Sequence, residues 1–306
     1  MNATGLPQTP TNFLTVRVGC ALGYEADQPT TIFLLIQPRL DPHGVVIHEE
    51  LTFGNGQHVE RLIDPHGNHV LKTMLVPGLN EIRHDMTLSV PDQSDNHGLQ
   101  SYSPVNVNLP YDVLRYTLPS RYCESDKLAA WAEQTFGQYA QGFETAEKIC
   151  DWTYRNIEYR YGSGDSTLSA CEALERRYGV CRDFAHVMIA LCRALGMPAR
   201  YVAGHMAQLD AAELDPNSDI GVDFHAYVEV YLGDAWHIFD PRHNKPHTGR
   251  IKVAHGMDAV DVAFATFSGH VRPVNFKVWA YSVLPALAVG GLHAVSNVSG
   301  SDQQSS

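Results

Sequence analysis

Short runs of β-branched and aromatic residues alternate with turn sequences along the first part of the chain. The runs cover residues 13–21, 31–37, 45–53, 69–76 and 81–90. Gly, Pro, Asn and Asp gather between them, as in Asp41-Pro42-His43-Gly44 and Gly54-Asn55-Gly56. Short strands separated by such turns are typical of antiparallel sheets. We therefore predict that the chain begins with a small antiparallel β-sandwich.

The hydrophobic pattern changes after residues 91–110, which are rich in Pro, Ser, Asn and Asp and are predicted to form a linker. Helices are predicted at 125–136 (with Ser125 as N-cap), 144–154, 169–176 and from residue 181, and strands at 200–206, 224–232, 236–239 and 274–284. Helices followed by strands predict an α+β fold. We expect an N-terminal β-sandwich domain at 1–105, a second domain at 106–290 and a disordered, Ser- and Gln-rich tail at 291–306.

Composition narrows the class of protein. The 306 residues are 44% hydrophobic and 18% charged, as in soluble globular proteins, and carry a formal net charge of −12. This charge disfavours a surface for nucleic acid or for membranes as the main function. No apolar run reaches the roughly 18 residues that span a bilayer, and the N-terminus lacks the basic and apolar pattern of a secretory signal. We therefore expect a cytoplasmic protein.

Cysteine usage agrees with this expectation. The six cysteines include no C-x-x-C pair, so neither a disulfide framework nor a structural zinc site of the usual kind is predicted. We expect five of them to be structural: Cys20, Cys123, Cys150, Cys171 and Cys192. The many histidines lack Cys or carboxylate partners at ligand spacing, so we expect no metal and no other cofactor.

The sixth cysteine, Cys181, begins a strongly patterned helix. The helix dipole favours a thiolate there. Further along, strict alternation places His225 and Tyr227 on one face of a strand, and Gly233-Asp234 suits a two-residue hairpin turn. With that turn Tyr227 lies opposite Asp240, so His225 becomes the diagonal neighbour of Asp240 on the same face. Cys181, His225 and Asp240 together outline a nucleophile system, although sequence spacing alone does not bring the cysteine to the histidine.

Four segments resemble the core of the transglutaminase-like superfamily. They are residues 179–185 (GVCRDFA), 190–204 (ALCRALGMPARYVAG), 225–230 (HAYVEV) and 236–241 (WHIFDP). The resemblance spans roughly residues 120 to 285. Residues 62–68 (LIDPHGN) also resemble the β domain that precedes this core in many bacterial members, which are described as cysteine proteases. Many members continue the Asp-Pro segment with threonine, whereas this chain continues with Arg242, which weakens inference about substrates from the animal enzymes.

The resemblance implies a papain-like catalytic core in which the cysteine helix packs on an antiparallel sheet. It implies that Cys181 is the nucleophile, His225 the general base and then acid, and Asp240 the orienting carboxylate. The backbone N–H of Cys181 is a natural oxyanion donor. For a second donor we consider Tyr159 or Tyr161, and we expect the nearby His243 to line the cleft.

Three functions follow from these residues. The first is a thiol hydrolase of amide or peptide bonds that works through a thioester, with a peptide, a protein or a small amide as its substrate. The second is an acyl transferase of transglutaminase type, which cross-links proteins or makes amides. The third is a non-catalytic binding protein that retains the fold. Hydrolysis is favoured because the sequence shows neither a dedicated amine site nor calcium-binding loops. The sequence leaves the oligomeric state open.

Overall fold

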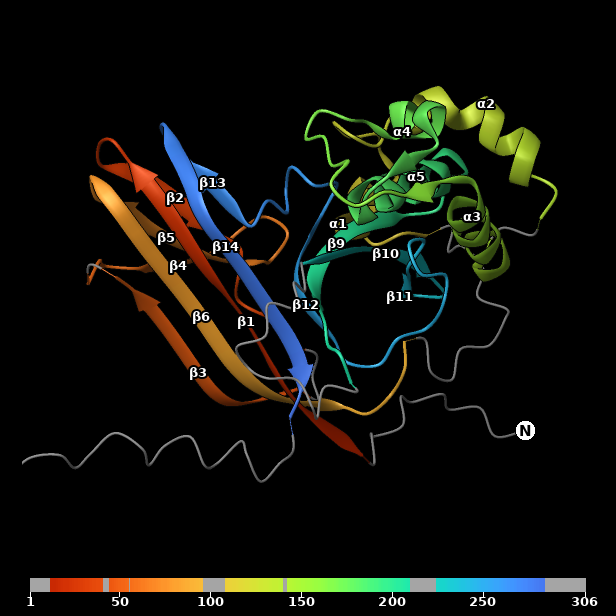
Figure 1. The fold of residues 1–306 in the computed structure, drawn as a ribbon. Helices are drawn as coiled ribbons and strands as arrows, with labels where there is room; N and C mark the ends of the chain where they lie inside the picture. Colours follow the sequence, from red (N-terminus) through yellow and green to blue (C-terminus); the bar gives the residue numbers. More distant parts are fainter. Residues whose placement is uncertain are drawn as a thin grey trace, which may run out of the picture.

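The computed structural model describes residues 12–40, 44–54, 56–95, 108–139, 142–209 and 224–283. Figure 1 shows a body of strands alone beside a body in which helices cover a sheet. The predicted α+β fold with an N-terminal β region is therefore confirmed. The predicted tail at 291–306, most of the predicted linker, and the turn residues 41–43 and 55 lie outside the described residues.

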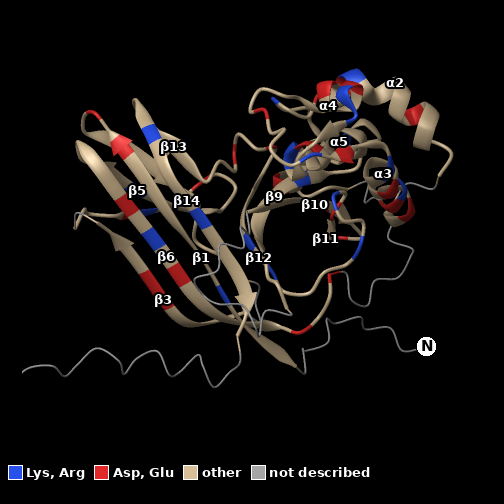
Figure 2. Ribbon diagram, viewed as in Figure 1, with Lys and Arg blue, Asp and Glu red and all other residues tan. Residues whose placement is uncertain are grey.

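The N-terminal body is a sandwich of two antiparallel four-stranded sheets. Their strand orders are β14-β1-β6-β3 and β13-β2-β5-β4. The strands are β1 (Phe13–Ala26), β2 (Thr30–Leu34), β3 (Val45–Phe53), β4 (Glu60–Ile63), β5 (His69–Leu75), β6 (Gly78–Pro91), β13 (Ala265–Phe267) and β14 (Val271–Ser282). Alternate side chains of facing strands, such as Leu22, Ile32 and Leu71, are buried between the sheets. Figure 2 shows charged residues along β6 and β3, where many positions are exposed.

The last two strands correct one sequence-based expectation. We expected the strand near 274–284 in the second domain, but β14 pairs with β1, with Cys20 opposite Val278. Likewise β13 pairs with β2. Alternation identifies a strand but not its partner, and this partner lies far away in the sequence. The sandwich is therefore formed by two separate parts of the chain, and the second body lies between them in the sequence.

The second body is one antiparallel sheet, in the order β11-β10-β9-β12, with helices packed on it. Its strands are β9 (Ala199–Met206), β10 (His225–Leu232), β11 (Ala235–Phe239) and β12 (Arg250–Gly256), and β7 (Glu158–Tyr159) pairs with β8 (Tyr178–Gly179). The helices are α1 (Tyr111–Leu114), the 3₁₀ helix η1 (Arg115–Thr117), α2 (Ser125–Phe136), α3 (Phe143–Asn156), α4 (Ala170–Arg176) and α5 (Cys181–Ala194). The predicted cap of α2 is wrong, because Ser125 is already helical and the preceding residue, Glu124, makes no side-chain cap bond.

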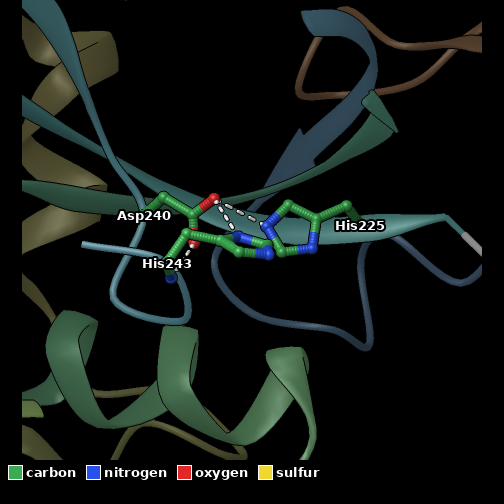
Figure 3. Close-up of side chains that lie close together, drawn as sticks. All are labelled: His225, Asp240 and His243. Carbon is green, nitrogen blue, oxygen red and sulfur yellow. Dashed lines mark hydrogen bonds and ion pairs between the residues drawn. The ribbon is translucent and has the colours of Figure 1, made fainter. Parts of the chain in front are cut away.

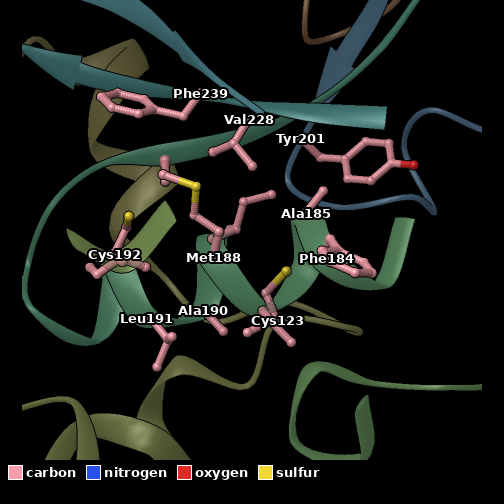
Figure 4. Packing of buried hydrophobic residues seen from close by; sticks show 14 of the residues in the cluster. Cys123, Phe184, Ala185, Met188, Ala190, Leu191, Cys192, Tyr201, Val228 and Phe239 are labelled. Carbon is pink, nitrogen blue, oxygen red and sulfur yellow. The ribbon is translucent and has the colours of Figure 1, made fainter. Parts of the chain in front are cut away.

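Helix α5 is the centre of this body. It packs against β9 and β10 on one side and against α2, α3 and α4 on the others. Its residues from Asp183 to Arg193 are all buried, as expected of a helix enclosed on every side. Figure 4 shows Met188 between the helix and the sheet residues Val228 and Phe239. This packing fixes the position of Cys181 at the N-terminal end of α5.

The loop at residues 64–68 of the sandwich contacts the second body through one buried side chain. Asn68, in the segment that resembles the β domain, has no exposed surface. Its side-chain Nδ2 donates to the carbonyl of His255 over 2.7 Å, and its Oδ1 accepts from the N–H of His255 over 3.0 Å. These two bonds connect the sandwich to β12 of the second body. None of the helices in the described part of the chain is long and apolar enough to cross a membrane.

Candidate active site

The β10–β11 hairpin places a histidine beside a carboxylate. Leu232 pairs with Ala235 and Val228 with Phe239, while Gly233 and Asp234 both have positive φ, at 56° and 68°. Positive φ at both central positions is typical of the two-residue turn that was predicted. The predicted register is therefore confirmed, and His225 Nε2 lies 2.8 Å from Asp240 Oδ2 (Figure 3).

Asp240 is buried and accepts several hydrogen bonds. Its Oδ2 accepts from His225, from His243 Nδ1 over 3.0 Å and from Arg250 Nη2 over 2.7 Å, while its Oδ1 accepts the backbone N–H groups of Arg242 and His243. Burial alone would raise the pKa of Asp240, but the bonds from both histidines and the charge of Arg250 hold this pKa well below its ordinary value. An ionised carboxylate only accepts, so the Nε2 of His225 carries a proton. In the neutral ring the lone pair is then on Nδ1.

Cys181 lies at the start of α5, partly buried, and lines the same cavity as His225. Even-numbered residues of β10 direct their N–H groups toward β11, but β11 pairs with β10 only as far as Val228. The N–H of Ala226 is therefore free of β11, and the backbone groups of Ala226 and Arg182 act on the pKa of the Cys181 thiol. Ala226, the strand residue next to His225, lines the same cavity as Cys181.

Burial changes the pKa values of both Cys181 and His225. It raises the pKa of the Cys181 thiol, although the amides of Ala226 and Arg182 partly offset the rise. It lowers the pKa of His225, although Asp240 partly offsets that change. Each charge alone is therefore disfavoured in the cavity. Transfer of the proton from thiol to imidazole creates both charges together and leaves the net charge of the pair unchanged.

The cavity has a volume of about 1210 Å³ and lies between the two bodies. The second body contributes Cys181, His225, the loop around Gly162 and most of the other walls. The sandwich contributes Leu35, Thr266 and Phe276. The arginines among the described residues of its lining are Arg182 and Arg242, and no carboxylate is among them.

Known proteins resemble this chain both in the second body and over most of its length. A family model described as the transglutaminase-like superfamily matches residues 129–241, which contain Cys181, His225 and Asp240. A crystal structure from Cytophaga hutchinsonii, described as that of a "putative cysteine protease", is 30% identical, with a TM-score of 0.77 over 90% of this chain and 92% of the other. The chain belongs to the transglutaminase-like superfamily.

Curated relatives match over shorter regions. A Mycobacterium leprae protein is 32% identical over 119 residues, which are 37% of this chain and 39% of the relative. A Mycobacterium tuberculosis (H37Rv) protein is 31% identical over 147 residues, 45% and 46% of the two chains. The chain therefore matches less than half the length of these two relatives.

The remaining predicted site residues line the cavity that contains Cys181 and His225. Tyr159 and Tyr161 both line the cavity, and Tyr161 is 81% exposed. The guanidinium of Arg242 lies 3.6 Å from the ring centre of Tyr159. Their role as oxyanion donors stays a prediction. His243 lines the cavity as expected, and its ring centre lies 4.9 Å from that of His225.

His225, Asp240 and His243 also satisfy the simplest geometric requirement for a metal site, because one ligand atom from each lies within 4.8 Å of the others. However, the same Asp240 oxygen that would bind a metal accepts from Arg250, whose positive charge opposes a cation there. Hydrogen bonds between the three side chains account for the arrangement. The three side chains therefore fit a hydrogen-bonded cluster better than a metal centre.

Sequence reasoning missed two residues that support the site. Arg250, on β12, joins Asp240 to Asp95, which accepts from its Nε over 2.6 Å. Asp95 follows the sandwich strand β6, and both side chains are buried. β12 was not among the predicted strands, although Ile251 and Val253 alternate with Arg250 and Lys252, and no local pattern connected Arg250 with Asp240.

Proposed function

We propose that this protein is a thiol-dependent hydrolase of amide or peptide bonds. The observation that carries the proposal is the shared cavity of Cys181, at the start of α5, and His225, which is hydrogen-bonded to a buried, ionised Asp240. A nucleophile, a base and an orienting group in this order are the parts that covalent catalysis requires. Membership of the superfamily and the likeness to the Cytophaga hutchinsonii structure agree with it.

In the proposed mechanism, His225 Nδ1 accepts the proton of the Cys181 thiol, and the sulfur attacks the substrate carbonyl. The oxyanion accepts hydrogen bonds from backbone N–H groups at the start of α5, for which that of Cys181 is well placed in sequence. The imidazolium then protonates the leaving amine as the C–N bond breaks, and a thioester remains on Cys181. His225 next deprotonates a water molecule, which attacks the thioester and releases the acid and the thiol.

Asp240 keeps the proton on Nε2 of His225 throughout, so that Nδ1 is the nitrogen that accepts and donates protons in the reaction. It also balances the charge of the imidazolium that forms inside a cavity where an isolated cation is disfavoured. The carboxylate itself need not change protonation, since its pKa lies far below neutrality.

Acyl transfer would use the same thioester with an amine in place of water. An amine acceptor is cationic near neutral pH and would need a carboxylate or similar partner in the cleft. The described lining of the cavity offers Arg182 and Arg242 and no carboxylate. This charge distribution favours water over an ammonium-bearing acceptor. The intact set of three residues likewise favours an enzyme over a binding protein that retains the fold.

A library of peptides and small amides, each assayed with and without a primary amine, tests the proposal. The wild type should release new carboxyl ends, and Cys181→Ala should abolish this activity. Cys171→Ala is the matched control, because Cys171 is also partly buried but lies outside the cavity. Activity that survives in Cys181→Ala contradicts the mechanism. A product that forms only when the amine is present identifies the acyl transferase instead.

A further inference from the structure

Three phenylalanines form one wall of the active-site cavity. Phe224 lies 5.9 Å from Phe264 and 6.4 Å from Phe276, and Phe264 lies 5.1 Å from Phe276, between ring centres. All three line the cavity that contains Cys181. We refer to Phe224, Phe264 and Phe276 as the aromatic wall.

The aromatic wall comes from three separate parts of the chain. Phe224 directly precedes His225, Phe264 lies between β12 and β13, and Phe276 lies on the sandwich strand β14. Phe224 packs against the core of the second body, as Cys181 does, and also against the core of the sandwich. The sandwich therefore reaches the cavity through the side chain of Phe276. This side chain contacts Phe224, the residue next to the proposed base His225.

Phe276 is 44% exposed although it contacts two other rings. A large apolar side chain held open toward a cavity remains available to bury further apolar surface. The charged residues of the described lining are Arg182, which is paired with the buried Asp183 over 3.1 Å, and Arg242. The side chains of the aromatic wall are hydrocarbon, and they offer no polar group to replace the hydration of a charged substrate side chain.

We infer that the aromatic wall is the specificity site for a bulky apolar side chain next to the scissile amide. The preferred substrates are then peptides or amides with an aromatic or branched aliphatic group near the bond that is cut. Small side chains leave the wall in contact with water, and charged side chains lose hydration without compensation. The statement about substrates rests on the proposed hydrolase function, whereas the apolar subsite itself does not.

Alkylation of Cys181 tests the subsite without requiring any turnover. The probes are N-benzyl-2-iodoacetamide and 2-iodoacetamide, and mass spectrometry follows the peptide that contains Cys181. The measured quantity is the ratio of the two alkylation rates, that of the benzyl reagent divided by that of iodoacetamide. In the wild type this ratio should be about ten, because the benzyl ring binds the aromatic wall. In Phe276→Ala this ratio should fall close to one, and in Phe276→Leu it should lie between.

Val274→Ala is the matched control, since Val274 lies two residues away on β14, is 41% exposed and lies outside the cavity lining. It should keep the wild-type ratio. A wild-type ratio near one, or a ratio that Phe276→Ala leaves unchanged while circular dichroism shows a folded protein, overturns the inference. Loss of peptide cleavage alone does not affect it, because the proposed function fails separately, through activity that persists in Cys181→Ala.

Discussion

At the scale of single residues, Asp240 organises the site. It accepts from His225, His243 and Arg250 on one oxygen, and from two backbone amides on the other. These donors keep the carboxylate ionised and immobile, which fixes the tautomer of His225. The geometry of the proposed base thus depends on a residue that does not touch the substrate in the proposed mechanism.

Asp240→Asn should lower kcat for amide hydrolysis by about 10³- to 10⁴-fold, because an amide at this position no longer holds the proton on Nε2 of His225. Steady-state kinetics on a cleaved peptide measure the effect. His243→Ala removes a neighbouring donor but leaves the His225–Asp240 pair, so its loss should be far smaller. Equal losses in the two variants would contradict the role assigned to Asp240.

Arg250→Met should shift the acid limb of the kcat/KM profile to higher pH. Burial lowers the pKa of His225 and the charge of Arg250 lowers it further, so removal of that charge should raise this pKa. Activity needs the neutral imidazole, and therefore it should decline at a higher pH in the variant. Asp95→Asn combined with Arg250→Met avoids an unpaired buried carboxylate and should show the same shift. An unchanged profile in both variants would mean that Arg250 is only structural.

Among the elements, the start of α5 depends on the close approach of Gly179 to the side chain of Asp183. The carboxylate of Asp183 is buried and accepts the N–H of Val180 over 2.8 Å. A Cβ at Gly179 would lie 2.5 Å from Asp183 Oδ2, which is too close for any side chain. Gly179 and Asp183 together therefore set where Cys181 lies.

Gly179→Ala should destabilise the protein by about 1–3 kcal/mol, because Asp183 must move and the helix start loses its bond to Val180. Urea unfolding gives the free energy, and iodoacetamide labelling reports the Cys181 environment. Gly164→Ala is the control, because a Cβ there would meet only ordinary contacts, the nearest at 3.7 Å. If Gly179→Ala is as stable as Gly164→Ala, the close contact does not position the helix.

The sequence predicted most elements because their causes are local. Alternation and a two-residue turn were sufficient to bring His225 to Asp240, since the register of a hairpin follows from its loop. Cys181 needed the family resemblance, because spacing does not say which strand a helix approaches. The pairing of β14 with β1 and the bond from Arg250 to Asp240 depend on contacts between distant segments, for which no local pattern exists.

At the scale of the whole molecule, buried histidines connect stability to pH. Burial lowers the pKa of His205 to about 3 and lowers the pKa values of His186 and His255 well below the ordinary range. All three stay neutral in the folded protein but gain a proton in the unfolded chain below its pKa of about 6.5. Their contribution to stability is therefore complete above that pH and is lost as the pH falls.

The free energy of unfolding should fall by about 1.4 kcal/mol per pH unit for each of these histidines between pH 6 and pH 5. Urea titrations at pH 7, 6 and 5 measure this slope. His205→Gln removes one titrating group, so the slope of this variant should be smaller by about 1.4 kcal/mol per pH unit. A slope that His205→Gln does not change would show that His205 takes up no extra proton on unfolding.

If Cys181 accepts the acyl group of the substrate, the thioester can be trapped on this residue. A reactive ester or a cleaved peptide is mixed with the protein, quenched in acid and analysed by mass spectrometry. We expect an acyl adduct on the peptide that contains Cys181. It should be sensitive to hydroxylamine and absent from Cys181→Ala, which should show no turnover. Turnover by Cys181→Ala, or an adduct on another residue that forms and decays at the rate of turnover, would contradict this role of Cys181.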